Sequence, residues 1–206
     1  MLLWFGLFLL ALGVACFAVD RRAAHVFHDR IGVVTHRRIA RTTDWAKGAY
    51  WLALSLGVIV ISYLPMWIGG PTPFLRLLSQ TALAYLASLA IGSAILHTMK
   101  LLLGRRRPRD ELELQLYGFL PFGFDLQYDS FPSGHALTIF CVAVIACGVF
   151  PALALLWLAI ALYLALTRAF LNAHFLSDVF IGSAVGLLTT RETVLYLFPA
   201  LSQSWF

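Results

Sequence analysis

Residues 130–167 read SFPSGHALTIFCVAVIACGVFPALALLWLAIALYLALT and contain no Asp, Glu, Lys or Arg. The same four residue types are absent from residues 1–19, 48–70 and 77–99. About 20 consecutive apolar residues are enough for a helix to cross the hydrocarbon core of a bilayer. The sequence therefore predicts an all-α protein that crosses a membrane several times, and it excludes a soluble globular domain.

The chain has 206 residues, of which 61% are hydrophobic and 12% charged, whereas a soluble domain carries about 25% charged residues. We expect a single integral-membrane domain, residues 1–206, built as a bundle of six transmembrane helices. The predicted helices cover residues 2–19, 48–68, 74–103, 133–150 and 151–170, and a sixth begins near residue 177. The first lacks the basic segment that precedes the apolar core of a signal peptide, so we expect it to be retained.

The basic residues gather in two connecting segments. Residues 20–47 hold seven basic and three acidic residues, and residues 105–109 hold four arginines. Nucleic-acid binding is one interpretation of such basic runs. Their position beside membrane-spanning helices favours anionic lipid head groups instead, so we expect no nucleic-acid partner. Part of segment 20–47 is expected to lie as a helix in the membrane interface.

The three cysteines, Cys16, Cys141 and Cys147, lie inside apolar stretches and lack the spacing of metal ligands. We interpret them as small buried apolar side chains. Their odd number and their placement argue against a disulfide framework, and we expect no metal site.

Three short blocks of polar residues lie near the ends of the predicted helices. They are Lys100 with Arg107-Pro108, then Pro132-Ser133-Gly134-His135, and then Arg168 with His174 and Asp178. Counting six spans from the N-terminus puts segment 20–47, the loop 104–132 and the turn after the fifth helix on one side of the membrane. The three blocks are therefore expected to meet at one membrane surface.

His174 and Asp178 are four residues apart, a spacing that makes two side chains neighbours on one face of a helix. A neutral imidazole attacks through one ring nitrogen, while a carboxylate at the other nitrogen fixes the tautomer and stabilises the cation that forms. The pair has the pattern of an activated histidine nucleophile. The alternative is a structural His–Asp pair inside a helix bundle.

Lys100, Arg107 and Arg168 are candidates for binding a phosphate group. Catalysis of phosphoryl transfer is largely positioning together with electrostatic stabilisation of the non-bridging oxygens. Arginine binds phosphate through two donors, and lysine acts as a point charge. Taken singly, Lys100 can instead extend its ammonium to the membrane interface, and Arg107 is one of four neighbouring arginines. Arg168 follows a long charge-free stretch and lies six residues before His174, so it faces the same region.

Ser133, Gly134 and His135 follow Pro132 at the expected start of the fourth helix. The N–H groups and the positive end of a helix N-terminus bind anions, and Gly134 lets the backbone approach a ligand closely. His135 is placed there to give a proton to a leaving oxygen. The alternative is an ordinary serine N-cap with a histidine at the membrane interface. Each of the three blocks has such a non-catalytic explanation. If all three explanations held, the blocks would lie on the same membrane face only by chance.

As a set, the blocks resemble the three signature motifs of the type 2 phosphatidic acid phosphatase superfamily, which also includes vanadium haloperoxidases and bacterial class A acid phosphatases. The matching patterns are Lys100-x6-Arg107-Pro108, Pro132-Ser133-Gly134-His135 and Arg168-x5-His174-x3-Asp178. The resemblance covers about residues 95–190. The third motif usually begins Ser-Arg, whereas this chain has Thr167-Arg168, which keeps the hydroxyl.

The resemblance implies an all-helical core of the phosphatase/haloperoxidase type and a phosphohistidine intermediate formed without a metal or cofactor. By position, His174 is the expected nucleophile, Asp178 its orienting carboxylate and His135 the acid. The expected phosphate-binding residues are Lys100, Arg107, Ser133, Gly134 and Arg168.

We therefore predict an integral-membrane lipid phosphatase whose partner is an anionic lipid phosphate. Bacterial members of this form resemble the chain and act on phosphatidylglycerophosphate, undecaprenyl pyrophosphate, phosphatidic acid or the phosphates of lipid A; the sequence does not name one. A phosphotransferase that passes the phosphoryl group to a lipid or sugar hydroxyl has the same motifs and stays open. A non-catalytic lipid-binding or lipid-translocating protein is a third alternative, although the complete catalytic set argues against it.

The resemblance also implies the bacterial inner membrane, with the site on the periplasmic face. The charge distribution argues the opposite way, because basic loops favour the cytoplasm and the face opposite the site offers only Arg76 and Arg191. We keep the periplasmic expectation because the motifs are specific and the charge rule is statistical. Gly182-x3-Gly186 permits close helix packing, within the chain or between copies, so the oligomeric state stays open.

Overall fold

The computed structural model describes residues 1–64, 72–122 and 128–205, and the regular elements in these ranges are helices. The long ones are α1 (Leu2–Cys16), α4 (Gly48–Tyr63), α5 (Pro73–Leu103), α7 (Gly134–Val149), α8 (Ala154–Phe170) and α9 (Leu176–Leu197). The short ones are α2 (Asp20–Arg30), α3 (Val33–Thr42), η1 (Thr43–Ala46), α6 (Pro108–Leu114), η4 (Pro151–Leu153) and α10 (Pro199–Trp205). The predicted all-α class is confirmed.

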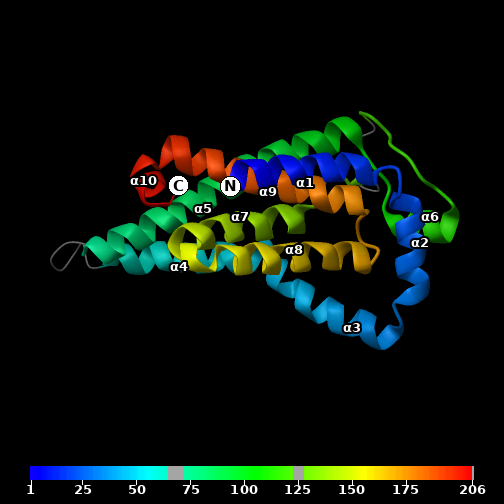
Figure 1. Ribbon diagram of the computed structural model, residues 1–206, viewed down its shortest axis with the longest axis horizontal. Coiled ribbons are helices and arrows are strands. Elements are labelled where there is room, and N and C mark those ends of the chain that lie inside the picture. Colours follow the sequence, from blue (N-terminus) through cyan, green and yellow to red (C-terminus); the bar gives the residue numbers. More distant parts are fainter. Residues whose placement is uncertain (65–71, 123–127, 206) are drawn as a thin grey trace.

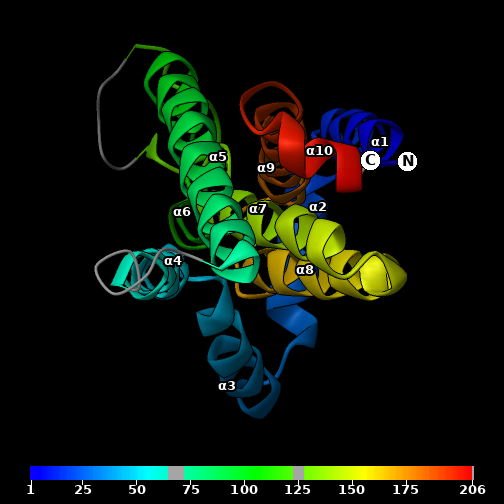
Figure 2. The same cartoon turned by 90° about the vertical axis from the view of Figure 1, so that its left-hand side faces the viewer.

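The long helices form a bundle in which α7 occupies a central position (Figure 1, Figure 2). α7 packs against α5, α8 and α9, and α1 lies along α9. Phe140 and Val144 of α7 are fully buried and share a core with Ala165 of α8 and Leu187 of α9. A helix that is apolar all round is suited to burial among other helices, which explains why the charge-free segment 134–149 takes this position.

Three helical segments are long and apolar enough to cross a membrane, namely Val33–Tyr63, Pro73–Leu103 and Pro151–Phe170. A fourth is added if α1 and α2, which meet at a bend of 86°, form one broken span. The helix α7 is apolar but shorter. The chain is a multi-pass membrane protein. Helices lie at all six predicted positions, but six spans are not confirmed within the described residues.

The basic segment 20–47 folds into α2, α3 and η1. α1 ends at Cys16, earlier than the predicted residue 19, and the chain then turns into α2. α2 lies across one end of the bundle, in contact with α6, α8 and α9, while α3 extends away from the bundle (Figure 1). The segment predicted to contain an interfacial helix therefore contains two α-helices, and the first of them covers the end where α9 begins.

The loop after α5 contains the short helix α6, which the sequence analysis did not predict. Pro108 lies in its first turn, where the missing N–H of a proline leaves no hydrogen bond unmade. Bridges from Arg105 to Phe119 and to Asp129 hold distant parts of this loop together. The predicted turn at 69–73 and the last part of the second predicted helix, residues 65–68, lie almost wholly outside the described residues.

α7 and α9 cross closely at two glycines. A Cβ added at Gly182 would overlap the backbone of Ser133, and one added at Gly186 would overlap the backbone of Leu137. The Gly182-x3-Gly186 pattern is therefore used for packing within the chain, one of the two uses that the sequence left open. The contact holds the first turn of α7 against the first turns of α9.

Candidate functional site

The three polar blocks meet at one end of the bundle, beside α2 and α6 (Figure 1). α5 and α8 end there, and α7 and α9 begin there. A backbone hydrogen bond of 3.0 Å, from the N–H of Ser133 to the carbonyl of Asp178, joins the second block to the third. The blocks therefore lie together as the count of helices had predicted.

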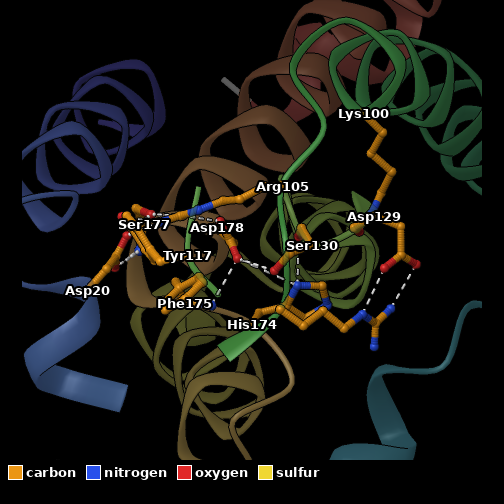
Figure 3. Close-up of polar contacts among 11 residues, drawn as sticks. Asp20, Lys100, Arg105, Tyr117, Asp129, Ser130, His174, Phe175, Ser177 and Asp178 are labelled. Atoms are coloured by element: carbon orange, nitrogen blue, oxygen red, sulfur yellow. Dashed lines mark hydrogen bonds and ion pairs between the residues drawn. The ribbon is translucent and has the colours of Figure 1, made fainter. Parts of the chain in front are cut away.

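His174 lies in the turn between α8 and α9, not on a helix as its spacing from Asp178 had indicated. Its backbone N–H donates to the carbonyl of Arg168 at 3.2 Å, which keeps these two residues of the third block together. The residue is 5% exposed, and Nδ1 lies 2.7 Å from the carbonyl oxygen of Ser130 (Figure 3). Because a carbonyl only accepts, Nδ1 carries the hydrogen and Nε2 keeps its lone pair.

Asp178 approaches the His174 ring without bonding to it. Its Oδ2 is 3.9 Å from Nδ1, which is beyond hydrogen-bonding distance. The same oxygen accepts from the hydroxyl of Ser130 at 2.6 Å and from the N–H of Phe175 at 2.9 Å, where it caps α9. The predicted direct hydrogen bond between Asp178 and the His174 ring is therefore absent. The Ser130 carbonyl fixes the tautomer of the ring, and Asp178 affects the ring through its negative charge and through its hydrogen bond with Ser130.

Lys100 and Arg107 converge on Asp129. Arg107 donates Nε and Nη2 to the two carboxylate oxygens, each at 2.8 Å, and the ammonium of Lys100 donates to the backbone carbonyl. Burial alone would raise the pKa of the Asp129 carboxyl, but the bonds and charge of Arg107, with the charge of Lys100, hold that pKa below its usual value. An ionised carboxylate thus lies against two residues predicted to bind phosphate.

Arg168 and Ser133 have buried polar atoms that are unused in the described part of the chain. Arg168 Nε and Ser133 Oγ have no hydrogen-bond partner there. The backbone N–H of Ser133 is taken by Asp178, so its hydroxyl is the group left for a ligand, and the space beside Gly134 is open to at least 4 Å. Leaving a buried polar group unpaired costs about 1–3 kcal/mol. These atoms therefore fit a ligand that both accepts hydrogen bonds and carries negative charge.

His135 lies in the first turn of α7, beside this group. The charged residues that act on its ring include Arg168, Lys47 and Arg107. His135 therefore shares its surroundings with the predicted phosphate-binding residues. Lys47, which pairs with Asp44 at 2.8 Å, was not singled out from the sequence.

The surroundings of His174 keep its imidazole neutral. Burial lowers the pKa of His174 well below its usual value, and the nearby charges of Lys100, Arg168 and Arg107 lower it further. A neutral ring with its hydrogen on Nδ1 has the Nε2 lone pair available for attack on an electron-poor atom. The same cations attract an anion to the ring.

Thr167 stands where the resembling motif has serine. Its hydroxyl donates to the carbonyl of Leu164 at 2.5 Å, and its oxygen lies 2.8 Å from the hydroxyl of Thr43. The pair of hydroxyls joins the end of α8 to η1. The hydroxyl that threonine shares with serine is therefore used to connect these two helices.

Besides Lys47, the sequence did not single out Asp20, Arg105, Asp129 and Ser130 as site residues. Asp20 carried a signal, since it is the first charged residue after the charge-free stretch 1–19. Arg105 was grouped with the basic residues that face lipid or substrate, but its terminal nitrogens bond to Asp20 and Asp178 instead.

The described residues offer no evident metal centre. Within residues 1–64, 72–122 and 128–205, no three His, Cys, Asp or Glu side chains are grouped so that they could hold a metal ion. All three cysteines are buried and unpaired as thiols, as predicted.

The sequence pattern of the PAP2 superfamily matches residues 81–201, which include all three polar blocks. This chain belongs to the PAP2 superfamily. The family predicted from the motifs is confirmed, because PAP2 denotes the type 2 phosphatidic acid phosphatases. The match covers more than half of the chain.

Two curated relatives are lipid A 1-phosphatases, from Rhizobium etli and Rhizobium johnstonii. Each is 34% identical to this chain over 104 residues, which is 50% of this chain. The matched segment covers 45% of the first relative and 43% of the second. The match thus spans less than half the length of these two proteins.

Two solved structures share the fold. Aquifex aeolicus LpxE aligns with a TM-score of 0.62 and 14% identity, over 86% of this chain and 96% of that one. The PAP2-type phosphatidylglycerolphosphate phosphatase of Bacillus subtilis aligns with a TM-score of 0.62 and 20% identity, over 96% of this chain and 94% of that one. At these identities the likeness concerns the fold, and function has to be argued from the site.

Proposed function

We propose that this PAP2 protein is an integral-membrane lipid phosphatase that hydrolyses a phosphate monoester or pyrophosphate through a phosphohistidine at His174. The observation that carries the proposal is the state of that ring. It is buried, its Nδ1 is bonded to a carbonyl, and Lys100, Arg168 and Arg107 surround it with positive charge. The other ring nitrogen, Nε2, therefore keeps a lone pair and can act as a nucleophile, and such cations stabilise the charge that develops on phosphoryl oxygens.

The proposed reaction has two steps. First, Nε2 of His174 attacks phosphorus and the P–O bond to the lipid breaks, while His135, starting in its protonated form, gives a proton to the leaving oxygen. Then His135 takes a proton from water, the water oxygen attacks phosphorus, and the P–N bond breaks to release inorganic phosphate. The proposed phosphate-binding groups are the side chains of Lys100, Arg107, Ser133 and Arg168 and the backbone at Gly134.

Asp178 has a separate part in this proposal. The His174 ring is positively charged once its bond to phosphorus has formed. The carboxylate, 3.9 Å from Nδ1, stabilises that charge because opposite charges at this distance attract strongly in a buried site. No metal or cofactor is required for either step.

The lipid A 1-phosphatases of the two Rhizobium species support a phosphate on lipid A as the first substrate to test. A cavity of about 550 Å³ beside Arg107 offers room for the sugar that bears such a phosphate. Residues that line this cavity include Phe27, His28, His36, Arg109 and Asn172. Hydroxyl-rich head groups suit a lining that mixes aromatic rings with hydrogen-bonding groups.

We further propose that the protein lies in the bacterial inner membrane with its site on the periplasmic face. Membership of the PAP2 superfamily supports this location. The basic helices α2 and α3 lie at the same end of the bundle as the site. Basic residues at the membrane surface attract anionic lipid head groups. This attraction explains the basic residues without requiring that they lie on the cytoplasmic side.

The test is phosphate release by the purified protein in detergent, with excess chelator present. The substrate panel is lipid A, phosphatidylglycerophosphate, undecaprenyl pyrophosphate and phosphatidic acid, and we expect turnover of at least one. Loss of activity under chelation contradicts the metal-free reaction. Product analysis with an added acceptor lipid separates hydrolysis from transfer of the phosphoryl group to that lipid.

His174→Asn is expected to lower kcat by at least roughly a thousandfold, because the nucleophile is removed while the fold is kept. The matched control is His97→Asn, since His97 is exposed on α5, and it is expected to keep normal turnover. Near-normal rates in His174→Asn would remove this residue as the nucleophile.

A further inference from the structure

Arg105 forms the centre of a buried ion cluster beside the site (Figure 3). Its Nη1 donates to Asp178 Oδ1 at 2.6 Å and to the hydroxyl of Ser177 at 2.7 Å. Its Nη2 donates to Asp20 Oδ2 at 2.8 Å and to the hydroxyl of Tyr117 at 2.9 Å. Each of the four hydrogens on these two nitrogens thus has an acceptor. Arg105 is therefore directed at carboxylates and is not available for the phosphate group.

The ionised side chains of the cluster are shielded from water. Arg105, Asp20, Asp178 and Ser177 are each at most 1% exposed. Four aromatic rings lie 4.2–5.4 Å from the guanidinium carbon, those of Phe17, Tyr117, Phe119 and Phe175. Charges interact strongly in such a medium, and a buried ion that loses its partner is costly. The state of each carboxylate therefore depends on the guanidinium that both share.

The cluster continues to the His174 ring through Ser130. Asp178 is bonded on one side to Arg105 and on the other to the Ser130 hydroxyl, at 2.6 Å. The carbonyl of Ser130 holds Nδ1 of His174, and the N–H of Ser130 donates to the carbonyl of Arg105 at 3.0 Å. The contacts run without a gap from Asp20 through Arg105, Asp178 and Ser130 to His174.

Asp20 joins this chain of contacts from the first residue of α2. Its Oδ1 accepts from the N–H of Ser177 at 3.0 Å, in the first turn of α9, and its Oδ2 is bonded to the Ser177 hydroxyl. A carboxylate is favourable at a helix N-terminus, where N–H groups lack partners in the helix. Asp20 thus binds both Arg105 and the helix that carries Asp178.

We propose that Arg105 and Asp20 are positioning residues of the phosphatase site, an inference that rests on the proposed function. Arg105 fixes the Asp178 carboxylate against Ser130, and Asp20 offsets the charge of Arg105 so that Asp178 keeps enough negative charge to stabilise the His174 cation. Neither residue touches the phosphate. Arg105 occupies one of the unspecified positions of the first motif, and Asp20 lies outside all three motifs. Asp20 therefore adds an element of the N-terminal part of the chain to the catalytic apparatus.

The test compares Asp20→Asn with Glu111→Gln in the phosphate-release assay. Glu111 is also fully buried and also bonded to α2, through Arg21 at 2.8 Å, but no contact described above leads from it to His174. Asp20→Asn is expected to lower kcat roughly tenfold to a hundredfold, the size of effect that misplacement of a catalytic group produces. The KM of Asp20→Asn is expected to stay within about twofold of the wild-type value, because the phosphate-binding groups are untouched. Glu111→Gln is expected to keep the kcat of the wild type.

A double-mutant cycle distinguishes positioning from general damage. If Asp20 acts through Asp178, then adding Asp20→Asn to Asp178→Asn changes kcat by less than about twofold, whereas independent effects multiply. Multiplying effects, or equal kcat values for Asp20→Asn and Glu111→Gln, would overturn the proposal. If Asp20→Asn does not fold, Ser177→Ala replaces it, because it removes one hydroxyl that links Asp20 to Arg105, and a loss in kcat of about threefold or more is expected. Wild-type protein that is inactive on every lipid phosphate would instead remove the proposed function itself.

Discussion

Asp129 and a phosphate substrate would compete for the same cations. In the free protein, Arg107 directs two donors at the Asp129 carboxylate, and Lys100 bonds to the carbonyl of that residue. A buried cation without a partner is costly, so the carboxylate keeps the unoccupied site paired. A phosphate that enters offers these cations a second anion in place of the Asp129 carboxylate.

The stability of the protein is expected to fall in weak acid because of His174. Its pKa is well below the usual value in the folded protein, whereas the unfolded chain has a histidine pKa of about 6.5. The unfolded state therefore binds the extra proton first, and stability is lost as pH falls below about 6.5, by up to about 1.4 kcal/mol per pH unit. Thermal unfolding in detergent between pH 8 and pH 5 measures this loss.

The matched comparison for that measurement is His174→Asn, which lacks the titrating group. Its melting temperature is expected to depend less on pH than that of the wild type between pH 6.5 and 5. Parallel curves for the two proteins over this range would contradict a neutral, buried His174.

At the scale of elements, the start of α9 organises the site. Its first turn is capped by the Asp178 side chain, and the Asp178 carbonyl accepts from the N–H of Ser133 at the start of α7. Gly182 and Gly186 let the two helices approach this closely. The distance between α7 and α9 therefore sets the position of Ser133 relative to Asp178.

Gly186→Ala is expected to destabilise the protein by about 1–3 kcal/mol, the usual cost of overpacking. The added methyl group would overlap the backbone at Leu137, which cannot move as a flexible side chain can. The control is Gly57→Ala on α4, where a Cβ meets nothing within 4 Å, and this variant is expected to unfold at or above the wild-type temperature. Equal melting temperatures for the two variants would show that α7 and α9 are not tightly packed there.

At the scale of the whole molecule, the N-terminal part of the chain belongs to the same assembly as the motifs. α1 lies along α9, and α2 covers the end of the bundle that carries the site (Figure 1). Asp20 and Arg21, at the start of α2, bond to Arg105 and Glu111 of the loop after α5. The first quarter of the chain has no signature motif, yet it closes one side of the site.

The sidedness of the molecule can be tested with single cysteines. The native cysteines Cys16, Cys141 and Cys147 are all buried, so they give little background with a membrane-impermeant thiol reagent. Arg109→Cys lies at the site end and Arg76→Cys near the start of α5, and both native residues are exposed. If the site is periplasmic, cells with a permeabilised outer membrane label Arg109→Cys but not Arg76→Cys. The reverse pattern would agree with the charge distribution and contradict the proposed location.

Much of the fold could be predicted because the signals are local in sequence. A charge-free stretch of sufficient length predicts a helix wherever it occurs, and α5 and α8 begin or end within a few residues of the predicted positions. The bend after Cys16 and the helix α6 were less predictable. Both depend on contacts with α9 and α2 that no local pattern encodes.

The order of the residues was enough to identify a helical membrane protein of the PAP2 superfamily and the candidate residues of the phosphate site. The spacing of motif residues and the length of apolar stretches can be read from the sequence without any coordinates. The packed helices were needed to show that Ser130 holds the His174 ring, that Asp129 pairs with Arg107, and that Arg105 lies between two carboxylates. Arg105 and its carboxylates are separated by 85 and 73 positions, and residues so far apart in sequence become partners only when the helices that carry them have packed.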